Sequence, residues 1–186
     1  MKNIQNSKDI ENDFIIELDH KIRSLALKKK KKILITEAWD ERALLAAFEV
    51  QREGIADIIL LGSKDKIMQQ AQKLNLDISN MQIVDPKTYN LYDKEKLIEQ
   101  LVQLRSYKGL TKEEAAKLLE NDNYFGCMLV YAGIADAIAG SCICPTGDLI
   151  RPALQILNSK KTKSNNIPSL FSIFIFKKSH NLFQKI

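Results

Sequence analysis

The sequence lacks the features that mark a membrane or secreted protein. No segment of its 186 residues reaches the roughly 20 consecutive apolar residues that a membrane-spanning helix needs. Residues 1–13 carry acids and amides where a secretory signal has an apolar core. The three cysteines are an odd number, which predicts reduced thiols in a cytosol. We therefore expect a cytoplasmic protein without a membrane partner.

Histidine is also scarce, and this argues against a metal site. His20 and His180 are the only two, and both lie far along the chain from the pair Cys142-x-Cys144. No second cysteine pair follows, so a structural or incidental role is favoured over metal binding. The net charge of +5 is modest and comes largely from residues 28–32 and the C-terminal tail. Such a lysine run is typical of a solvated helix end, so we expect no nucleic-acid partner. No cofactor is expected either.

Short apolar runs alternate with segments of helical periodicity along the first 157 residues. Strands are predicted at Ile33–Thr36, Ile58–Leu61, Gln82–Val84 and Asp136–Ala139, and helices at Phe14–Leu25, Asp40–Glu53, Lys64–Leu74, Asp93–Lys108, Lys112–Glu120, Tyr124–Ala132 and Asp148–Leu157. This alternation predicts an α/β fold, a three-layer parallel sheet with flanking helices. Ligands of such sheets gather beyond the carboxyl ends of the strands, which here include residues 36–39 and 62–63.

Several helix ends carry recognisable signals. Gly54 and Gly133 each follow a predicted helix, where a left-handed residue ends it. Thr111 and Glu114 have the spacing of a capping box. Asp148 follows the loop at residues 140–147 and is predicted to cap the last helix.

The chain changes character after Leu157. Residues 158–166 are polar and of low complexity, Ile167–Phe176 is sharply apolar, and residues 177–186 are basic. We expect an N-terminal α/β region at residues 1–157 and a divergent tail at 158–186. Without a partner the apolar segment would be exposed or loosely docked, an aggregation hazard. A genuine strand is the alternative interpretation.

Two blocks carry a resemblance to a known family. Residues 104–115 read LRSYKGLTKEEA, and residues 123–156 read NYFGCMLVYAGIADAIAGSCICPTGDLIRPALQI. In order and spacing they resemble the middle of phosphate acetyltransferases (phosphotransacetylases), which show KG(L/M)T, NYFG, a G-x-A-D-G segment and an RPALQI run. Family members are about twice this length, so the resemblance implies a chain that ends early, with the second domain largely missing.

The resemblance implies transfer of an acetyl group between acetyl phosphate and coenzyme A, two anionic substrates that need a cationic cleft. Arg105 precedes the KGLT stretch and Arg151 begins RPALQ, so both are expected to contact coenzyme A or phosphate. The alternative for Arg105 is a solvated helix residue. Arg151 sits in the first turn of a predicted helix, where free N–H groups attract anions.

Other residues of these blocks have two interpretations each. Thr146 could donate a hydrogen bond to phosphate or bond the nearby backbone. Asp148 is expected to cap a helix rather than act as a base, because a carboxylate beside phosphate would repel it. Tyr124 and Phe125 resemble the family block, but aromatics that open a helix are expected to pack in the core.

The sequence also departs from the family pattern. Thr36-Glu37-Ala38 stands where the family has Pro-Glu-Gly, and Pro145 replaces a hydroxyl residue. No residue matches the serine, arginine and aspartate of the family's C-terminal segment, so no catalytic residue is assigned. Phosphate butyryltransferase is the nearest alternative family, and a non-catalytic remnant that at most binds coenzyme A or phosphate is the alternative function. The family is commonly dimeric, so a homodimer is the expected assembly of a full-length chain.

Overall fold

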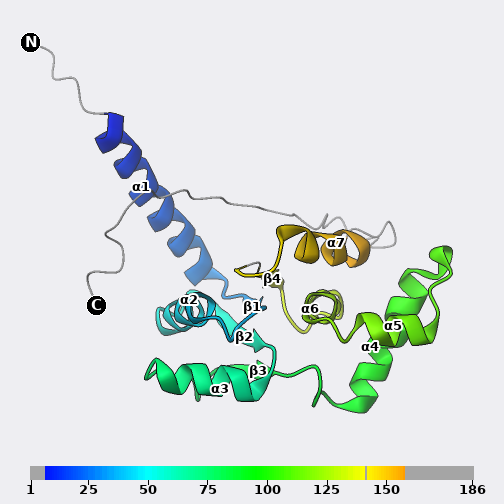
Figure 1. Ribbon diagram of the computed structural model, residues 1–186. Helices are drawn as coiled ribbons and strands as arrows, with labels where there is room; N and C mark the ends of the chain where they lie inside the picture. The colour runs from blue at the N-terminus through cyan, green and yellow to red at the C-terminus, as the bar shows by residue number, and fades with distance from the viewer. Residues whose placement is uncertain (1–6, 141, 158–186) are drawn as a thin grey trace, which may run out of the picture.

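The computed structural model describes residues 7–140 and 142–157, which form a parallel sheet between two layers of helices (Figure 1). The strands are β1 (Lys32–Ile35), β2 (Asp57–Leu61), β3 (Gln82–Val84) and β4 (Ala137–Ala139). The helices are α1 (Ser7–Lys28), α2 (Glu41–Arg52), α3 (Lys64–Lys73), α4 (Leu91–Leu104), α5 (Lys112–Leu118), α6 (Asp122–Tyr131) and α7 (Thr146–Ile156), with a 3₁₀ turn, η1, at Ser106–Lys108.

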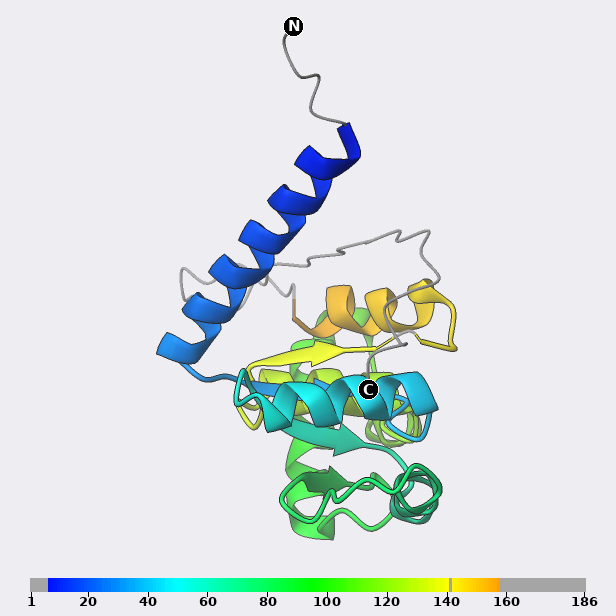
Figure 2. The same cartoon turned by 90° about the vertical axis from the view of Figure 1, so that its left-hand side faces the viewer.

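The strand order is β3-β2-β1-β4, and every pair is parallel. Ile33 of β1 stands opposite Ile58 on one side and Ala137 on the other. Helices α2 and α3 cover one face of the sheet, while α6 lies on the other with α4, α5 and α7 around it (Figures 1 and 2). The predicted α/β fold with a parallel sheet and flanking helices is confirmed.

Alternation along β2 divides the core between the two faces of the sheet. Ile58 and Leu60 pack with α2 and α3, whereas Ile59 and Leu61 pack with α6. Successive strand residues point to opposite faces, so an all-apolar strand is buried on both sides. Helix α6 crosses the sheet so closely that a Cβ on Gly126 would lie 2.7 Å from the side chain of Ile138. Any larger residue at position 126 would force the side chains of Ile138, Leu61 and Leu34 to shift.

The first helix is longer than its apolar periodicity indicated. Helix α1 runs from Ser7 to Lys28 and projects away from the rest of the fold (Figure 2). Its apolar side chains Ile16, Ile22 and Leu25 are about half exposed. Among the described helices, α1 included, none combines the length and apolarity that crossing a bilayer requires.

Local end signals were mostly predicted correctly. Thr111 and Glu114 form the capping box, and Gly54 and Gly133 have left-handed φ values just after α2 and α6. One cap was wrong: Asp148 does not cap α7. Pro145 occupies the cap position without a side-chain hydrogen bond, so α7 begins at Thr146 and Asp148 lies inside its first turn. There its negative charge faces the positive end of the helix dipole.

Two further boundaries differ from the prediction. Helix α4 ends at Leu104 rather than Lys108, because the chain tightens into η1, which Gly109 closes with φ +72°. Helix α6 begins at Asp122, two residues early, because the side chain of Asn121 caps it. The predicted tail, residues 158–186 with the apolar segment Ile167–Phe176, lies outside the described residues.

Candidate functional site at the ends of β1 and β4

The strand order reverses direction between β1 and β4, which makes this the topological switch point of the sheet. The chain moves outward from β1 through β2 to β3 and then returns to add β4 on the other side of β1. Loops that leave the carboxyl ends of such neighbours diverge, and ligands of open α/β sheets bind there. In this chain those loops begin at Thr36 and Gly140 and lead into α2 and α7.

Glu37 ties the two loops together. Its Oε2 accepts the backbone N–H groups of Cys142 at 2.7 Å and Ile143 at 3.1 Å, and its Oε1 accepts that of Cys144 at 2.7 Å. Burial by itself raises the pKa of Glu37, but these N–H donors and the Cys144 side chain outweigh it and hold the pKa below its ordinary value. The carboxylate is therefore charged and fixes the path of residues 142–144.

Arg42 adds a second link from α2 to the same loop. Its guanidinium donates to the backbone oxygen of Cys142 at 3.0 Å and pairs with Asp40, which caps α2. Asp40 accepts the N–H groups of Arg42 and Ala43, and its pKa is lowered chiefly by the Arg42 side chain. The exposed Arg42 side chain is paired with Asp40, so its charge is largely balanced within the loop region.

Beneath the loop lie two buried polar atoms that accept no hydrogen bond within the described residues. One is Thr36 Oγ1, which lies 1.9 Å from the position of a Cβ on Gly140, so position 140 admits only glycine. The other is Asn123 Oδ1; the amide nitrogen of Asn123 contacts Cys144 Sγ at 3.7 Å. Buried polar groups of this kind are the exception in folded proteins.

Burial keeps two of the cysteines, Cys127 and Cys142, as thiols rather than thiolates. Cys127 is a core residue whose burial raises its pKa to about 12. Burial, followed by Asp40 and Glu37, also raises the pKa of Cys142. Elsewhere in the described part of the chain, no three His, Cys, Asp or Glu side chains gather as a metal site would require.

Two of the three predicted binding residues lie on α7, and the third, Arg105, approaches its C-terminal end. Thr146 and Arg151 are exposed on the helix itself, Thr146 at its first residue. Arg105 follows α4, and its guanidinium approaches the backbone oxygen of Gln155 at 3.5 Å. Nine residues separate Thr146 from Gln155, about 14 Å along a helix. Thr146 and Arg105 therefore lie at opposite ends of α7, whereas Arg151 is one turn from Gln155.

The aromatic pair of the NYFG block packs, as predicted. Phe125 is fully buried and meets Tyr89 edge to face, with ring centroids 5.1 Å apart. Tyr124 donates its hydroxyl hydrogen to Gln155 Oε1 at 2.8 Å, which joins α6 to α7. The sequence placed Glu37 among residues 36–39 near the expected site but did not predict its contacts, and it gave no signal for Asn123. Glu37 did stand in the family's Pro-Glu-Gly position, but its three acceptor bonds join residues about one hundred positions apart.

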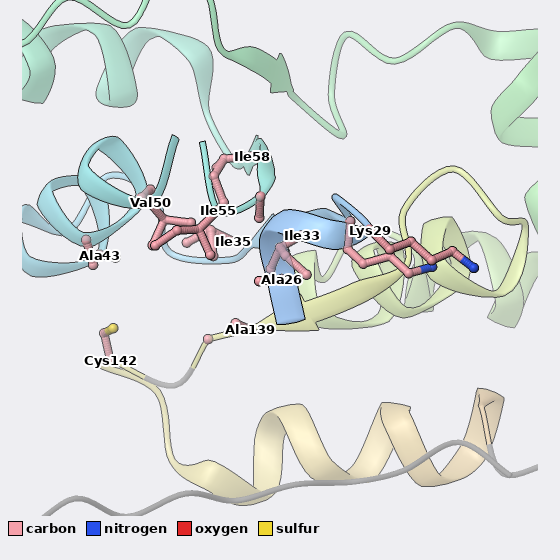
Figure 3. A pocket seen from close by; sticks show the side chains of 15 residues that line it. Ala26, Lys29, Ile33, Ile35, Ala43, Val50, Ile55, Ile58, Ala139 and Cys142 are labelled. Carbon is pink, nitrogen blue, oxygen red and sulfur yellow. The ribbon is translucent and has the colours of Figure 1, made fainter. Parts of the chain in front are cut away.

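An apolar cavity of about 570 Å³ adjoins the crevice on the α2 face of the sheet (Figure 3). Ile33 and Ile35 of β1, Val50 of α2 and Ile55 after it line its floor and walls, and Cys142 lies at the loop side. Apart from Lys29 and Lys31 at one side, the lining is apolar, so it suits an apolar group better than a phosphate. The cavity shares Gly140 and Cys142 with the loop that Glu37 holds.

Comparison with known proteins agrees with the two sequence blocks. The family model described as phosphate acetyl/butaryl transferase matches residues 17–184, which runs past Leu157. A phosphate acetyltransferase of Staphylococcus aureus is 44% identical over 145 residues, and one of Staphylococcus epidermidis is 41% identical over 145 residues; in both cases the match covers 78% of this chain and 43% of the relative. The chain thus spans less than half the length of these relatives.

Solved structures give the same result. The EutD phosphotransacetylase from Staphylococcus aureus has 43% sequence identity and a TM-score of 0.68, over 77% of this chain and 42% of that one. A phosphotransacetylase from Streptococcus pyogenes has 37% identity and a TM-score of 0.72, over 77% and 43%. Because the family model matches residues 17–184, nearly the whole of this chain, the chain belongs to the phosphate acetyl/butaryl transferase family.

Proposed function

We propose that this chain supplies the coenzyme A and phosphate-binding part of a phosphate acetyltransferase. The reaction converts acetyl phosphate and coenzyme A reversibly into acetyl-coenzyme A and phosphate. The thiol loses its proton to a base, its sulfur forms a bond to the acetyl carbon, and the bond from that carbon to the phosphate oxygen breaks with its electron pair leaving on phosphate. The observation that carries the proposal is the position of the RPALQI helix, α7, directly after the loop that Glu37 holds at the ends of β1 and β4.

Each predicted binding residue is assigned one contact with an anionic group of the substrates. Arg151 on α7 offers a planar fork that pairs with phosphate oxygens bidentately. Thr146, together with the N–H groups that begin the uncapped α7, offers donors to an anion. Arg105, half-buried at the far end of α7, would bind a second anionic group of coenzyme A, which carries several phosphates.

The two carboxylates beside the loop, Glu37 and Asp148, are poorly suited to be the base that removes the thiol proton. Glu37 is committed to three N–H groups with a lowered pKa, so it is a weak base. Asp148 stands in the first turn of α7, where it would repel bound phosphate. We assign the base and the donors for the developing oxyanion to the C-terminal segment that the resemblance implies for the family.

The remaining features of the proposal follow from the family. The substrates are small molecules, coenzyme A or acetyl-coenzyme A and phosphate or acetyl phosphate, and no resident metal or organic cofactor takes part. We place the protein in the cytoplasm and expect a homodimer for a full-length chain. A butyryl rather than acetyl group is the alternative substrate, since residues 140–148 depart from the acetyl pattern.

A thioester assay combined with a coenzyme A titration tests the proposal. The purified chain, free of host enzyme, is mixed with coenzyme A and either acetyl or butyryl phosphate, and thioester formation is followed. We expect coenzyme A to bind, and thioester to form no faster than without protein, because the missing base alone costs about 10²–10⁴-fold. Absence of coenzyme A binding would refute the proposed function. A robust rate would place the base within this sequence, against our assignment.

A further inference from the structure

Strand β4 lies at an edge of the sheet where a neighbour is missing. Among the described strands it pairs with β1 alone, so its other side offers unpaired backbone N–H and C=O groups. Strands of a parallel sheet are normally buried on both faces. The last four residues of β2 follow this rule, but none of the three apolar residues of β4 is buried. The edge of β4 therefore lacks a covering element within residues 7–140 and 142–157.

Apolar surface is uncovered on both faces beside this edge. On the α2 face, the cavity of about 570 Å³ is bordered by Ala139 and Gly140 at the β4 side (Figure 3). On the other face, Ile150 and Leu154 lie four residues apart on one side of α7. Ile150 is only partly covered, and Leu154 is 51% exposed. A strand beside β4 with apolar side chains on both faces would cover both surfaces.

The connections of the sheet place the next strand at this same edge. Helices α2 and α3 lie on one face and join strands that step from β1 towards β3. The chain then crosses the opposite face through α6 and adds β4 in the opposite direction. Helix α7 lies on the α6 face but farther along the sheet, past β4 (Figure 1). Connections between parallel strands are right-handed in nearly all cases, so a parallel strand that follows α7 lies beyond β4.

Helix α7 also delivers the chain to the correct end of the sheet. It runs back against the direction of β4, so the chain leaves it near the amino edge, where a parallel strand begins (Figure 2). Residues 158–166 can span roughly 30 Å when extended. Packed layers are about 10 Å apart, so this length suffices to pass from the helix layer to the sheet.

The sequence supplies a segment of strand character at this point. Ile167–Phe176 reads IPSLFSIFIF, rich in the β-branched and aromatic residues that favour strands. Apolar residues occupy both alternating sets of positions in its second half, Leu170, Phe174 and Phe176 in one and Phe171, Ile173 and Ile175 in the other. That pattern suits a strand covered on both faces. We propose that Ile167–Phe176 pairs with the free edge of β4 as a fifth parallel strand, with α7 as the crossover helix.

Magnetic resonance of the isotope-labelled full chain tests this pairing directly. We expect nuclear Overhauser effects between backbone protons of residues 170–176 and those of Ala137–Ala139, in the pattern of a parallel pair. Amide exchange of residues 171–175 should be at least about a hundredfold slower than in an unstructured chain. Exchange at the unstructured rate, an antiparallel pattern, or contacts with β3 instead of β4 would each overturn the proposal.

A second copy of the chain is the other occupant that the edge could take, and mixed labelling separates the two. In a sample that combines chains of two labelling patterns, the effects are expected within one chain. Effects found only between differently labelled chains would show that a partner's segment covers β4, and would overturn the proposal.

Two variants assign the pairing to the apolar segment. Phe174→Asp puts a charge where the proposed strand is covered, so the cross-strand effects and the slow exchange should both be lost. Phe183→Asp is the matched control, an aromatic residue of the tail outside the segment, and should keep both. A Phe174→Asp chain with unchanged contacts would overturn the proposal, and the wild-type spectra decide the matter if this variant fails to fold. None of these measurements involves coenzyme A, so the fifth strand and the proposed function stand or fall separately.

Discussion

The contact of Glu37 with residues 142–144 makes a quantitative prediction about stability. Glu37→Gln keeps the size, the shape and the backbone conformation, which has a left-handed φ of +55°. It retains one acceptor oxygen but turns an NH₂ group toward an N–H donor, so one or two of the three bonds are lost. A hydrogen bond to a charged group contributes about 1.5–3 kcal/mol. Because the loop N–H groups can turn to water, we expect a loss of about 1–2 kcal/mol at neutral pH.

The pH dependence follows from the direction of the shift. The pKa of Glu37 is lowered in the folded chain, so its contribution is fully present above the ordinary glutamate value of about 4.3. It is lost as the pH falls through the folded pKa, because the protonated acid no longer attracts the three N–H groups. Glutamine does not titrate. The difference in unfolding free energy between wild type and Glu37→Gln should therefore be constant near neutral pH and shrink below about pH 4.

Urea unfolding of both chains across this pH range measures the difference. Glu120→Gln is the matched control, an exposed carboxylate after α5, and should stay within about 0.5 kcal/mol of wild type. A Glu37→Gln chain as stable as wild type at neutral pH would refute the reasoning. So would a difference that persists unchanged in acid.

Three further outcomes are expected. Gly126→Ala should lower the unfolding free energy by about 1–3 kcal/mol in urea unfolding, because the new Cβ would lie 2.7 Å from a strand side chain; an unchanged midpoint would contradict the packing of α6. Gly140→Ala should destabilise the chain, but by less in combination with Thr36→Ala, and a double-mutant cycle with purely additive values would exclude their contact. A chain ending at Leu157 should be more soluble than the full chain if residues 158–186 find no partner, and loss of cooperative melting on their removal would instead assign them to the core.

The fold could be predicted from the sequence because its signals are local. Each strand is a short apolar run, and Asp40, Thr111 and Gly133 mark helix ends through bonds or φ values within a few residues. The prediction that Asp148 caps α7 was wrong because two positions could start this helix. An aspartate is the better cap by side chain, but the backbone that follows Pro145 is already helical at Thr146.

The candidate site was only partly accessible from the sequence. The family blocks identified α7 and the residues it carries, but no spacing shows that Glu37 reaches the N–H groups of Cys142 and Cys144. Nor does any periodicity show that Trp39 and Asp122 both lie beside Gly62. Both arrangements depend on which strands become neighbours, and β4 joins β1 from about one hundred residues away. Tertiary packing determines these contacts, as it does most site geometry.

The central claim is that α7 and the residues beside it bind coenzyme A. Calorimetric titration of coenzyme A into wild type, Arg151→Ala and Arg105→Ala tests it most directly, with Arg52→Ala as the control, an exposed α2 arginine that pairs with Glu49. Loss of a charge-assisted bond of about 1.5–3 kcal/mol predicts a dissociation constant raised about ten- to a hundredfold in the first two variants and unchanged in the control. An unchanged constant in Arg151→Ala, in a chain that binds coenzyme A, would contradict the account.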